Sequence, residues 1–359
     1  MKKNYSKLAE RVRKSSNPEG LGYNRVLLNE SLNVPYTDAN EYVKLSMWGV
    51  PSEYTNISEK AADMVIATLK RSHGSEVDFR RQGSIMTNTH IWNENDVDIV
   101  QITSKSTSLD RTGLEKALGS EKYRYDGVEL MNLQKHKDNF SQYSGDQTSD
   151  LRSLRIKSEI VLVDNYSEVI IDKPKAICVK MQNPKRNIDV VTAVDYKAVQ
   201  YMASNKEYKR GIQVYDKDLD DKLPAEFPFW SIKLINDRHI ESGRRFKKII
   251  RFLKNVKFDC GQIEDRKLTV SSFDINAICY SISVSKYQYL HYLELVAVLA
   301  LKLHELVDNK YVRDSLKSID EQEHIFLNKG NEKVEDLVII RDFVDELLES
   351  IAFQNRLVG

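Results

Sequence analysis

The spacing of apolar residues in the first half of the chain predicts both helices and strands. Apolar residues recur at helical spacing over residues 55–70, and a second helix is expected over residues 125–143. Alternation of apolar and polar residues predicts strands at residues 77–81 and 96–102. Short apolar runs predict four more strands, at residues 159–163, 168–172, 176–181 and 187–193. We therefore expect a mixed β-sheet with flanking helices in this half.

The second half changes character, because its apolar residues follow helical spacing. Helices are predicted at residues 243–257, 273–282, 287–307 and 335–351. A polar, turn-rich stretch near residues 205–225 separates the two halves. The expected fold class is therefore α+β and bilobal, with a sheet-containing lobe over residues 1–210 and a helical C-terminal lobe over residues 211–359.

Composition and charge exclude several classes of protein but indicate no particular activity. The chain has 359 residues, of which 54 are Lys or Arg and 53 are Asp or Glu, so its formal net charge is +1. This balance excludes a wholly basic nucleic-acid coat and an acidic tail protein. No apolar run approaches the roughly 18 residues of a membrane-spanning helix, and no apolar stretch follows the basic N-terminus. The three cysteines are widely spaced, as is typical of free thiols in a reducing compartment. Together with the lack of a long apolar run, this spacing predicts a cytoplasmic protein without a membrane partner.

One short segment combines the residue types that grip phosphate and metal. Gly83-Ser84 is followed, after a spacer, by a predicted strand that carries Asp96 and Asp98. Residues two apart on a strand point to the same face, so the two carboxylates repel each other unless a cation lies between them. Their oxygens suit Mg²⁺. Gly83 lets the backbone approach a ligand closely, and Ser84 offers a hydroxyl and an N–H to a phosphate oxygen.

A third carboxylate is needed for in-line transfer assisted by two metal ions. Asp189 is the candidate, because it lies inside the apolar run of residues 187–193. A charge in such a run is costly without a partner. A lone Asp in a strand more often makes structural hydrogen bonds, but the first motif favours a metal ligand here.

Together these motifs resemble the nucleotidyltransferase superfamily with a polymerase-beta-type palm. The resemblance rests on Gly-Ser, a spacer, Asp-hydrophobic-Asp-hydrophobic and a later hydrophobic-Asp-hydrophobic strand, in that order. It implies two Mg²⁺ ions in each active site, with Mn²⁺ as a substitute, held by catalytic ligands on both strands. The implied metal ligands are Asp96, Asp98 and Asp189, and the implied triphosphate-binding residues beside them are Gln82, Gly83 and Ser84.

A basic helix in the second half extends the set of candidate residues. Residues 243–257 contain seven basic residues and no acidic one. Helical periodicity places Lys247, Arg251 and Lys254 opposite the apolar stripe, where they form a row of positive charge. Ser272 is expected to cap the next helix and to provide an anion site at its N-terminus. A solvated basic face, and core packing of Phe273, stay open as structural interpretations.

This second half resembles the bacterial cGAS/DncV-like nucleotidyltransferases (CD-NTases), and the likeness runs from Thr55 to Ile351. It implies that residues 1–210 are a nucleotidyltransferase core with an N-terminal spine helix. It also implies that Phe273 stacks on a base. The residues implied to hold the donor triphosphate are Lys247, Arg251, Lys254 and Ser272.

The activity implied by the resemblance is synthesis of a nucleotide second messenger. Such an enzyme joins NTPs (ATP, GTP or pyrimidine NTPs) into a cyclic di- or oligonucleotide, releases pyrophosphate and signals in anti-phage defence. A downstream effector protein binds the product. Two alternatives stay open: a nucleotidyltransferase that acts on an RNA or protein acceptor, and an RNA-binding sensor that keeps the same palm. RNA also stays open as an activator.

Overall fold

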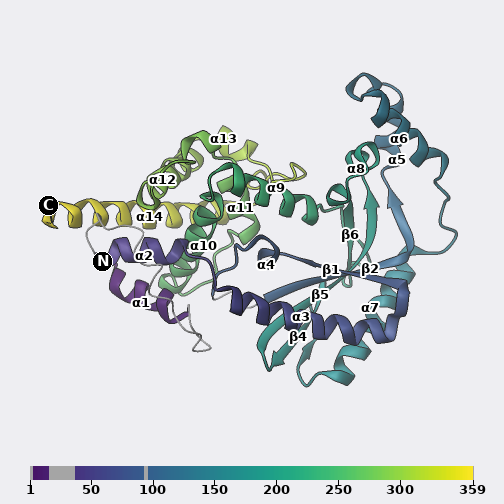
Figure 1. The fold of residues 1–359 in the computed structure, drawn as a ribbon, viewed down its shortest axis with the longest axis horizontal. Helices are drawn as coiled ribbons and strands as arrows, with labels where there is room; N and C mark the ends of the chain where they lie inside the picture. The colour runs from purple at the N-terminus through teal and green to yellow at the C-terminus, as the bar shows by residue number, and fades with distance from the viewer. Residues whose placement is uncertain (1–2, 16–36, 93–95, 359) are drawn as a thin grey trace. The chain divides into compact units, whose positions relative to one another are not determined.

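The computed structural model describes residues 3–15, 37–92 and 96–358, and the chain divides into two compact units (Figure 1). The helical unit comprises Met1–Glu53, Thr87–Glu94 and Leu234–Gly359, and the sheet unit comprises Tyr54–Met86 and Asn95–Lys233. Both units are discontinuous in sequence. This division differs from the predicted one at residue 210, because residues 211–216 form a strand that pairs within the sheet.

A mixed sheet forms the centre of the sheet unit. Its strands within the described residues are β1 (Val77–Gln82), β2 (Asp96–Leu109), β3 (Val169–Ile170), β4 (Ala176–Gln182), β5 (Lys185–Lys197), β6 (Gly211–Asp216) and β7 (Asp221–Lys222). The order is β1-β2-β5-β4-β3, and β6 pairs with both β5 and β7. β2 and β5 run parallel, whereas the other pairs are antiparallel. The expected mixed sheet is therefore confirmed.

Two long helices cover one face of this sheet. α3 (Ser52–His73) and α7 (Gln147–Asn165) lie along the same face of the sheet (Figure 1). Their apolar side chains pack on the strands. The buried strand residues beneath them include Val97 and Ile99 of β2 and Ile188 and Val190 of β5. Because strand residues alternate between faces, the acidic residues of β2 and β5 point to the opposite face of the sheet.

One predicted strand is wrong, since residues 159–163 lie in α7. The run is short and rich in β-branched residues, which favoured a strand. In the structure Asp146 caps the helix by accepting hydrogen bonds from the N–H groups of Thr148 and Ser149, and the helix continues through the run. Leu162 then packs in the core, whereas Ile160 is 58% exposed.

Shorter helices complete the sheet unit. They are α4 (Ser84–Thr87), α5 (Arg111–Leu118), α6 (Gly127–Asp138), α8 (Val199–Ser204) and the first part of α9 (Pro228–Glu241). The helix predicted over residues 125–143 is α6, which ends five residues earlier than expected. A capping box of Asp126 and Glu129 defines its start.

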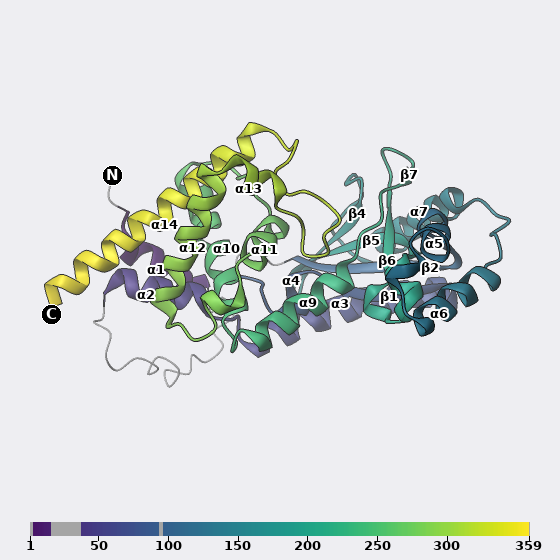
Figure 2. The same ribbon diagram turned by 90° about the horizontal axis from the view of Figure 1, so that it is seen from above.

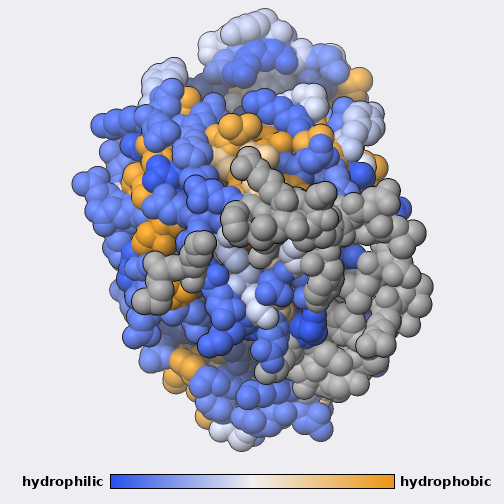
Figure 3. Space-filling model, turned by 90° about the vertical axis from the view of Figure 1, so that its left-hand side faces the viewer, coloured by the Kyte–Doolittle hydropathy of each residue, from blue (hydrophilic) through white to orange (hydrophobic). Residues whose placement is uncertain are grey.

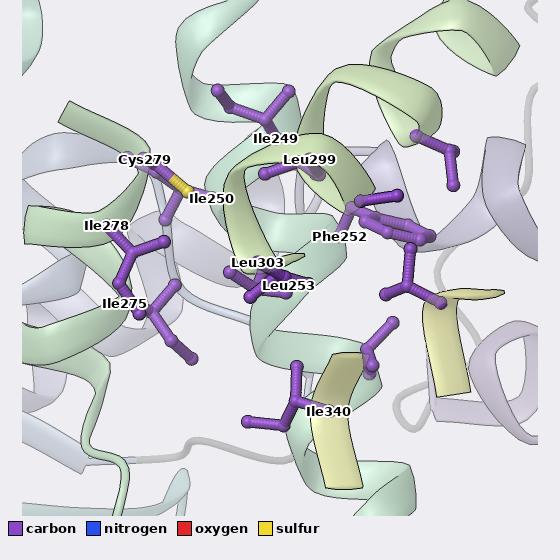
Figure 4. Close-up of a cluster of buried hydrophobic side chains, with 14 of the residues drawn as sticks. Ile249, Ile250, Phe252, Leu253, Ile275, Ile278, Cys279, Leu299, Leu303 and Ile340 are labelled. Atoms are coloured by element: carbon purple, nitrogen blue, oxygen red, sulfur yellow. The ribbon is translucent and has the colours of Figure 1, made fainter. Parts of the chain in front are cut away.

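The helical unit packs around one central helix. Its helices are α1 (Tyr5–Ser15), α2 (Asp38–Met47), α10 (Phe246–Ile263), α11 (Ser272–Tyr280), α12 (Tyr292–Asp308), α13 (Lys310–Ser315) and α14 (Asn331–Val358). Figure 4 shows apolar side chains of α10 meeting those of α11, α12 and α14. The long α14 lies beside α12, as Figures 1 and 2 show. The four helices predicted in this half are confirmed, with ends shifted by one to seven residues.

The surface of the molecule is largely hydrophilic on the face that Figure 3 shows, with small separate groups of hydrophobic residues. Of the helices in the described part of the chain, none is long and apolar enough to cross a membrane.

Candidate active site

The turn after β1 places a glycine directly against a carboxylate. β1 ends at Gln82, which pairs with Asp98 in the β1–β2 ladder, and α4 begins at Ser84. Gly83 between them has φ +80°, a left-handed conformation that favours glycine. A Cβ added to Gly83 would overlap the side chain of Asp98. The predicted phosphate-gripping turn and the predicted metal ligand are therefore in direct contact.

The three predicted acidic ligands share one face of the sheet. Asp98 on β2 lies opposite Asp189 on β5 in the parallel register, and adjacent strands are about 4.8 Å apart. Asp96 is two residues before Asp98, so its side chain points the same way. Asp96 is exposed, and Asp98 and Asp189 are partly exposed. Asn187 Nδ2 donates to Asp96 Oδ1 at 2.9 Å.

A lysine that the sequence did not single out binds the third carboxylate. Lys173 Nζ donates to both oxygens of Asp189, at 3.0 and 3.2 Å. Burial lowers the pKa of Lys173, but its hydrogen bond to Asp189 and that carboxylate's charge outweigh burial, so the pKa is raised overall. Burial, followed by a hydrogen bond with Asp189, raises the pKa of the neighbouring Cys178 thiol to about 11.

These residues suit a divalent metal by their chemistry and strand register. Three acidic side chains lie at adjacent positions of one face, and the ammonium of Lys173 already lies where a cation would neutralise Asp189. As the side chains lie, however, no three His, Cys, Asp or Glu groups among the described residues are gathered closely enough to hold one ion. The carboxylates of Asp96 and Asp189 instead bind Asn187 and Lys173.

The basic residues of α10 belong to the helical unit, and two of the three candidate phosphate-binding residues among them are buried. Lys247 is partly buried and donates to Asn236 Oδ1 at 2.7 Å. Arg251 is 7% exposed and Lys254 is 1% exposed, so the alternative interpretation of a solvated basic face is wrong at both positions. The reason is that α10 is surrounded by other helices, so even its polar face is largely covered.

Backbone carbonyls satisfy part of the buried guanidinium of Arg251. Arg251 donates to the carbonyl oxygens of Met47 at 3.0 Å and Asn88 at 2.7 Å. Burial lowers the pKa of Arg251 to about 10, so it stays charged at neutral pH. This arrangement is a structural anchor within the helical unit.

The start of α11 differs from its prediction by one residue. Ser271, not Ser272, is the N-cap: its hydroxyl accepts from the Asp274 N–H at 3.1 Å, in a capping box. Ser272 is the first helical residue. Phe273 is 41% exposed, so core packing does not explain it.

The structure thus brings together six of the predicted residues in the sheet unit, on β1, α4, β2 and β5. They are Gln82, Gly83, Ser84, Asp96, Asp98 and Asp189. The other five lie in the helical unit, on α10 and α11: Lys247, Arg251, Lys254, Ser272 and Phe273. Lys173 was missed because no periodicity marks it, and only the packing of its loop beside β5 brings it to Asp189.

Comparison with known proteins tests the family that the motifs resemble. The family described as cGAS/DncV-like nucleotidyltransferase C-terminal helical domain matches residues 233–351. A c-di-GMP synthase from Flavobacteriaceae sp. is 46% identical over 367 residues, covering 100% of both chains.

Solved structures of c-di-GMP synthases resemble this chain in both fold and sequence. The STING-associated CdnE c-di-GMP synthase from Flavobacteriaceae sp. has a TM-score of 0.88 at 45% identity, covering 99% of this chain and 100% of that one. The corresponding enzyme from Capnocytophaga granulosa has a TM-score of 0.76 at 34% identity, covering 98% and 100%. The chain therefore belongs to the bacterial cGAS/DncV-like nucleotidyltransferases, as its motifs predicted.

Proposed function

We propose that this nucleotidyltransferase joins two molecules of GTP into c-di-GMP in two metal-dependent steps, releasing pyrophosphate at each step. The observation that carries the proposal is the parallel pairing of Asp98 with Asp189, with Gly83 against Asp98. A relative that covers the whole chain at 46% identity is a c-di-GMP synthase, which supports the choice of GTP.

The site residues of the sheet unit have distinct tasks in the proposed reaction. Asp96 and Asp98 hold two Mg²⁺ ions, for which Mn²⁺ substitutes, and Asp189 completes the ligand set. When bound, the ions supply positive charge that stabilises the attacking oxygen and the leaving pyrophosphate. Asp189 also orients the acceptor hydroxyl. Gly83 leaves room for the triphosphate, and Ser84 offers it a hydroxyl and an N–H.

Bond changes in each step balance without a further reactant. The acceptor's ribose oxygen attacks the α-phosphorus of the donor in line and loses its proton, which Asp189 helps to remove. The bond from the α-phosphorus to its bridging oxygen breaks, and pyrophosphate leaves. The second step repeats this within the linear intermediate and closes the ring.

Residues of the helical unit have proposed roles in holding the donor. Lys247, Arg251, Lys254 and Ser272 are proposed to bind the triphosphate, and Phe273 to stack on a base. The partial exposure of Lys247, the position of Ser272 at a helix start and the exposed ring of Phe273 support these roles. The carbonyl bonds of Arg251 and the burial of Lys254 support them less.

The proposed product acts as a second messenger in anti-phage defence, read by a separate effector protein. One relative is described as STING-associated, which supports a receptor that is distinct from the synthase. The requirement for GTP supports a cytoplasmic enzyme. The burial of Arg251 and Lys254 takes charge away from the surface of α10, which disfavours that helix as an RNA-binding face.

Replacing one carboxylate tests the catalytic assignment. We expect Asp98→Asn to lower the rate of pyrophosphate release from GTP and Mg²⁺ by at least about 10³-fold, because it removes a charged ligand needed in the transition state. Asp78→Asn on β1 is the matched control, since that exposed carboxylate pairs with Arg80 on the same strand. Near-normal activity of Asp98→Asn, with the fold intact by circular dichroism, would refute the proposal.

A further inference from the structure

The third acidic residue of the site already has a cationic partner within the chain. Lys173 Nζ bridges both oxygens of Asp189, and their side chains are 43% and 19% exposed. Two like charges, Asp98 and Asp189, lie opposite each other on neighbouring strands, so an ammonium bound to Asp189 lowers their repulsion. The pairing is therefore more than a chance contact of two surface groups.

A buried arginine holds the loop that carries Lys173. Arg155 on α7 is 1% exposed and donates to four backbone carbonyls of residues 171–176. Its acceptors are the carbonyl oxygens of Ile171 at 3.1 Å, Lys173 at 3.0 Å, Pro174 at 3.3 Å and Ala176 at 3.1 Å. The loop is thus tied to α7 on both sides of Lys173, which fixes the point from which its side chain reaches β5.

The positive charge of Arg155 is paired with the carboxylate of Glu159 on the same helix. Arg155 Nε donates to Glu159 Oε1 at 2.8 Å, and Lys217 Nζ donates to the same oxygen at 3.1 Å. Burying such a network is costly unless each group is paired, so its completeness indicates a defined loop conformation. By contrast, Lys175 in the same loop is exposed and makes no ion pair with any residue that the structure describes.

We propose that Lys173 is a positioning residue that serves as an exchangeable counter-cation for Asp189. Before nucleotide and metal bind, its ammonium neutralises Asp189 and holds that carboxylate away from the other two. A divalent metal must displace the ammonium to gain Asp189 as a ligand, so metal alone binds weakly. The metal that arrives with a nucleotide triphosphate completes the site. This inference rests on the proposed metal-binding role of Asp189.

Direct measurement of metal binding tests the exchange. Free Mn²⁺ is titrated by electron paramagnetic resonance against the full chain without nucleotide, in wild type, Lys173→Met, Lys175→Met and Asp189→Asn. A partly exposed ion pair contributes up to about 1 kcal/mol, which is about five-fold in affinity. We expect Lys173→Met to bind Mn²⁺ about five-fold more tightly and Lys175→Met to bind it as wild type does.

The outcomes separate this inference from the proposed function. Asp189→Asn is expected to weaken Mn²⁺ binding. If it does, and Lys173→Met binds Mn²⁺ no more tightly than wild type, the counter-cation role is refuted and the metal site stands. If Asp189→Asn leaves Mn²⁺ binding unchanged, Asp189 is not a metal ligand and both ideas fail. Since Lys173 is partly exposed, its substitution leaves the fold intact, which thermal unfolding verifies.

Discussion

Gly83 offers a sharp test of the site, because its lack of a side chain matters for two separable reasons. Its φ of +80° is unfavourable for alanine, and a Cβ at this position would overlap the Asp98 carboxylate. Gly83→Ala therefore strains the backbone and also moves a proposed metal ligand. The two effects differ in size and in the quantity that they change.

The backbone effect acts on stability and is modest. A left-handed conformation costs an alanine about 1–2 kcal/mol relative to glycine. The side-chain effect acts on catalysis. Relief of the overlap requires Asp98 to shift by about 1 Å, and a displacement of that size costs about 10²-fold in rate.

Gly74 provides the matched control within the same unit. Its φ is +62°, and a Cβ added there would meet no heavy atom within 4 Å. Gly74→Ala thus introduces similar backbone strain with no contact to the site. Pyrophosphate release from GTP is measured for both variants beside their thermal unfolding. We expect similar losses of stability, with a fall in rate of about 10²-fold in Gly83→Ala alone. Equal rates in the two variants would show that the contact with Asp98 does not matter for catalysis.

Further substitutions test the anchors around the site. Arg155→Met removes the buried donor that Glu159 and four loop carbonyls share, and Glu159 keeps only Lys217 as a partner, so we expect a loss of about 3–5 kcal/mol in denaturant unfolding. Arg152→Met, one turn earlier on α7, breaks an exposed ion pair with Asp220 and is expected to leave the stability close to that of wild type. Ser271→Ala removes the N-cap of α11 and is expected to cost about 1 kcal/mol, whereas a raised KM for GTP in Ser272→Ala would support its phosphate-binding role.

The stability of the folded chain is also expected to depend on pH through His239 in the helical unit. Burial, followed by nearby cations such as Lys247, lowers the pKa of His239 from 6.5 to about 4. Between these values the unfolded chain binds a proton that the folded chain does not, so stability falls as pH drops through this window. Thermal unfolding from pH 7 to pH 4 is expected to show a smaller decline in His239→Gln than in wild type; an equal decline would contradict the assignment.

The start of β2 was predictable because its first residues alternate between buried and exposed positions. The alternation around Asp96 and Asp98 placed both carboxylates on one side, and the structure confirms this with Val97 and Ile99 in the core. The run at residues 159–163 misled because local strand preference lost to a helix that starts at a strong cap far upstream.

Contacts made only by tertiary packing were not predictable. Helical periodicity placed Arg251 on the polar side of its helix, but carbonyl oxygens of Met47 and Asn88, both far away in sequence, allow its burial. Similarly, the pairing of Asp98 with Asp189 depends on strand order, and the position of Lys173 depends on the hydrogen bonds that Arg155 makes to its loop. Such partners leave no periodic signal in the sequence.

The central claim is that the carboxylates of β2 and β5 direct the synthesis of a cyclic dinucleotide from GTP. The most direct measurement is to incubate the purified chain with GTP and Mg²⁺, with and without RNA, and to identify the product by mass spectrometry and phosphatase treatment. We predict c-di-GMP, resistant to phosphatase, with one pyrophosphate released for each GTP consumed. A product with a free terminal phosphate, or nucleotides added to the RNA, would contradict the account.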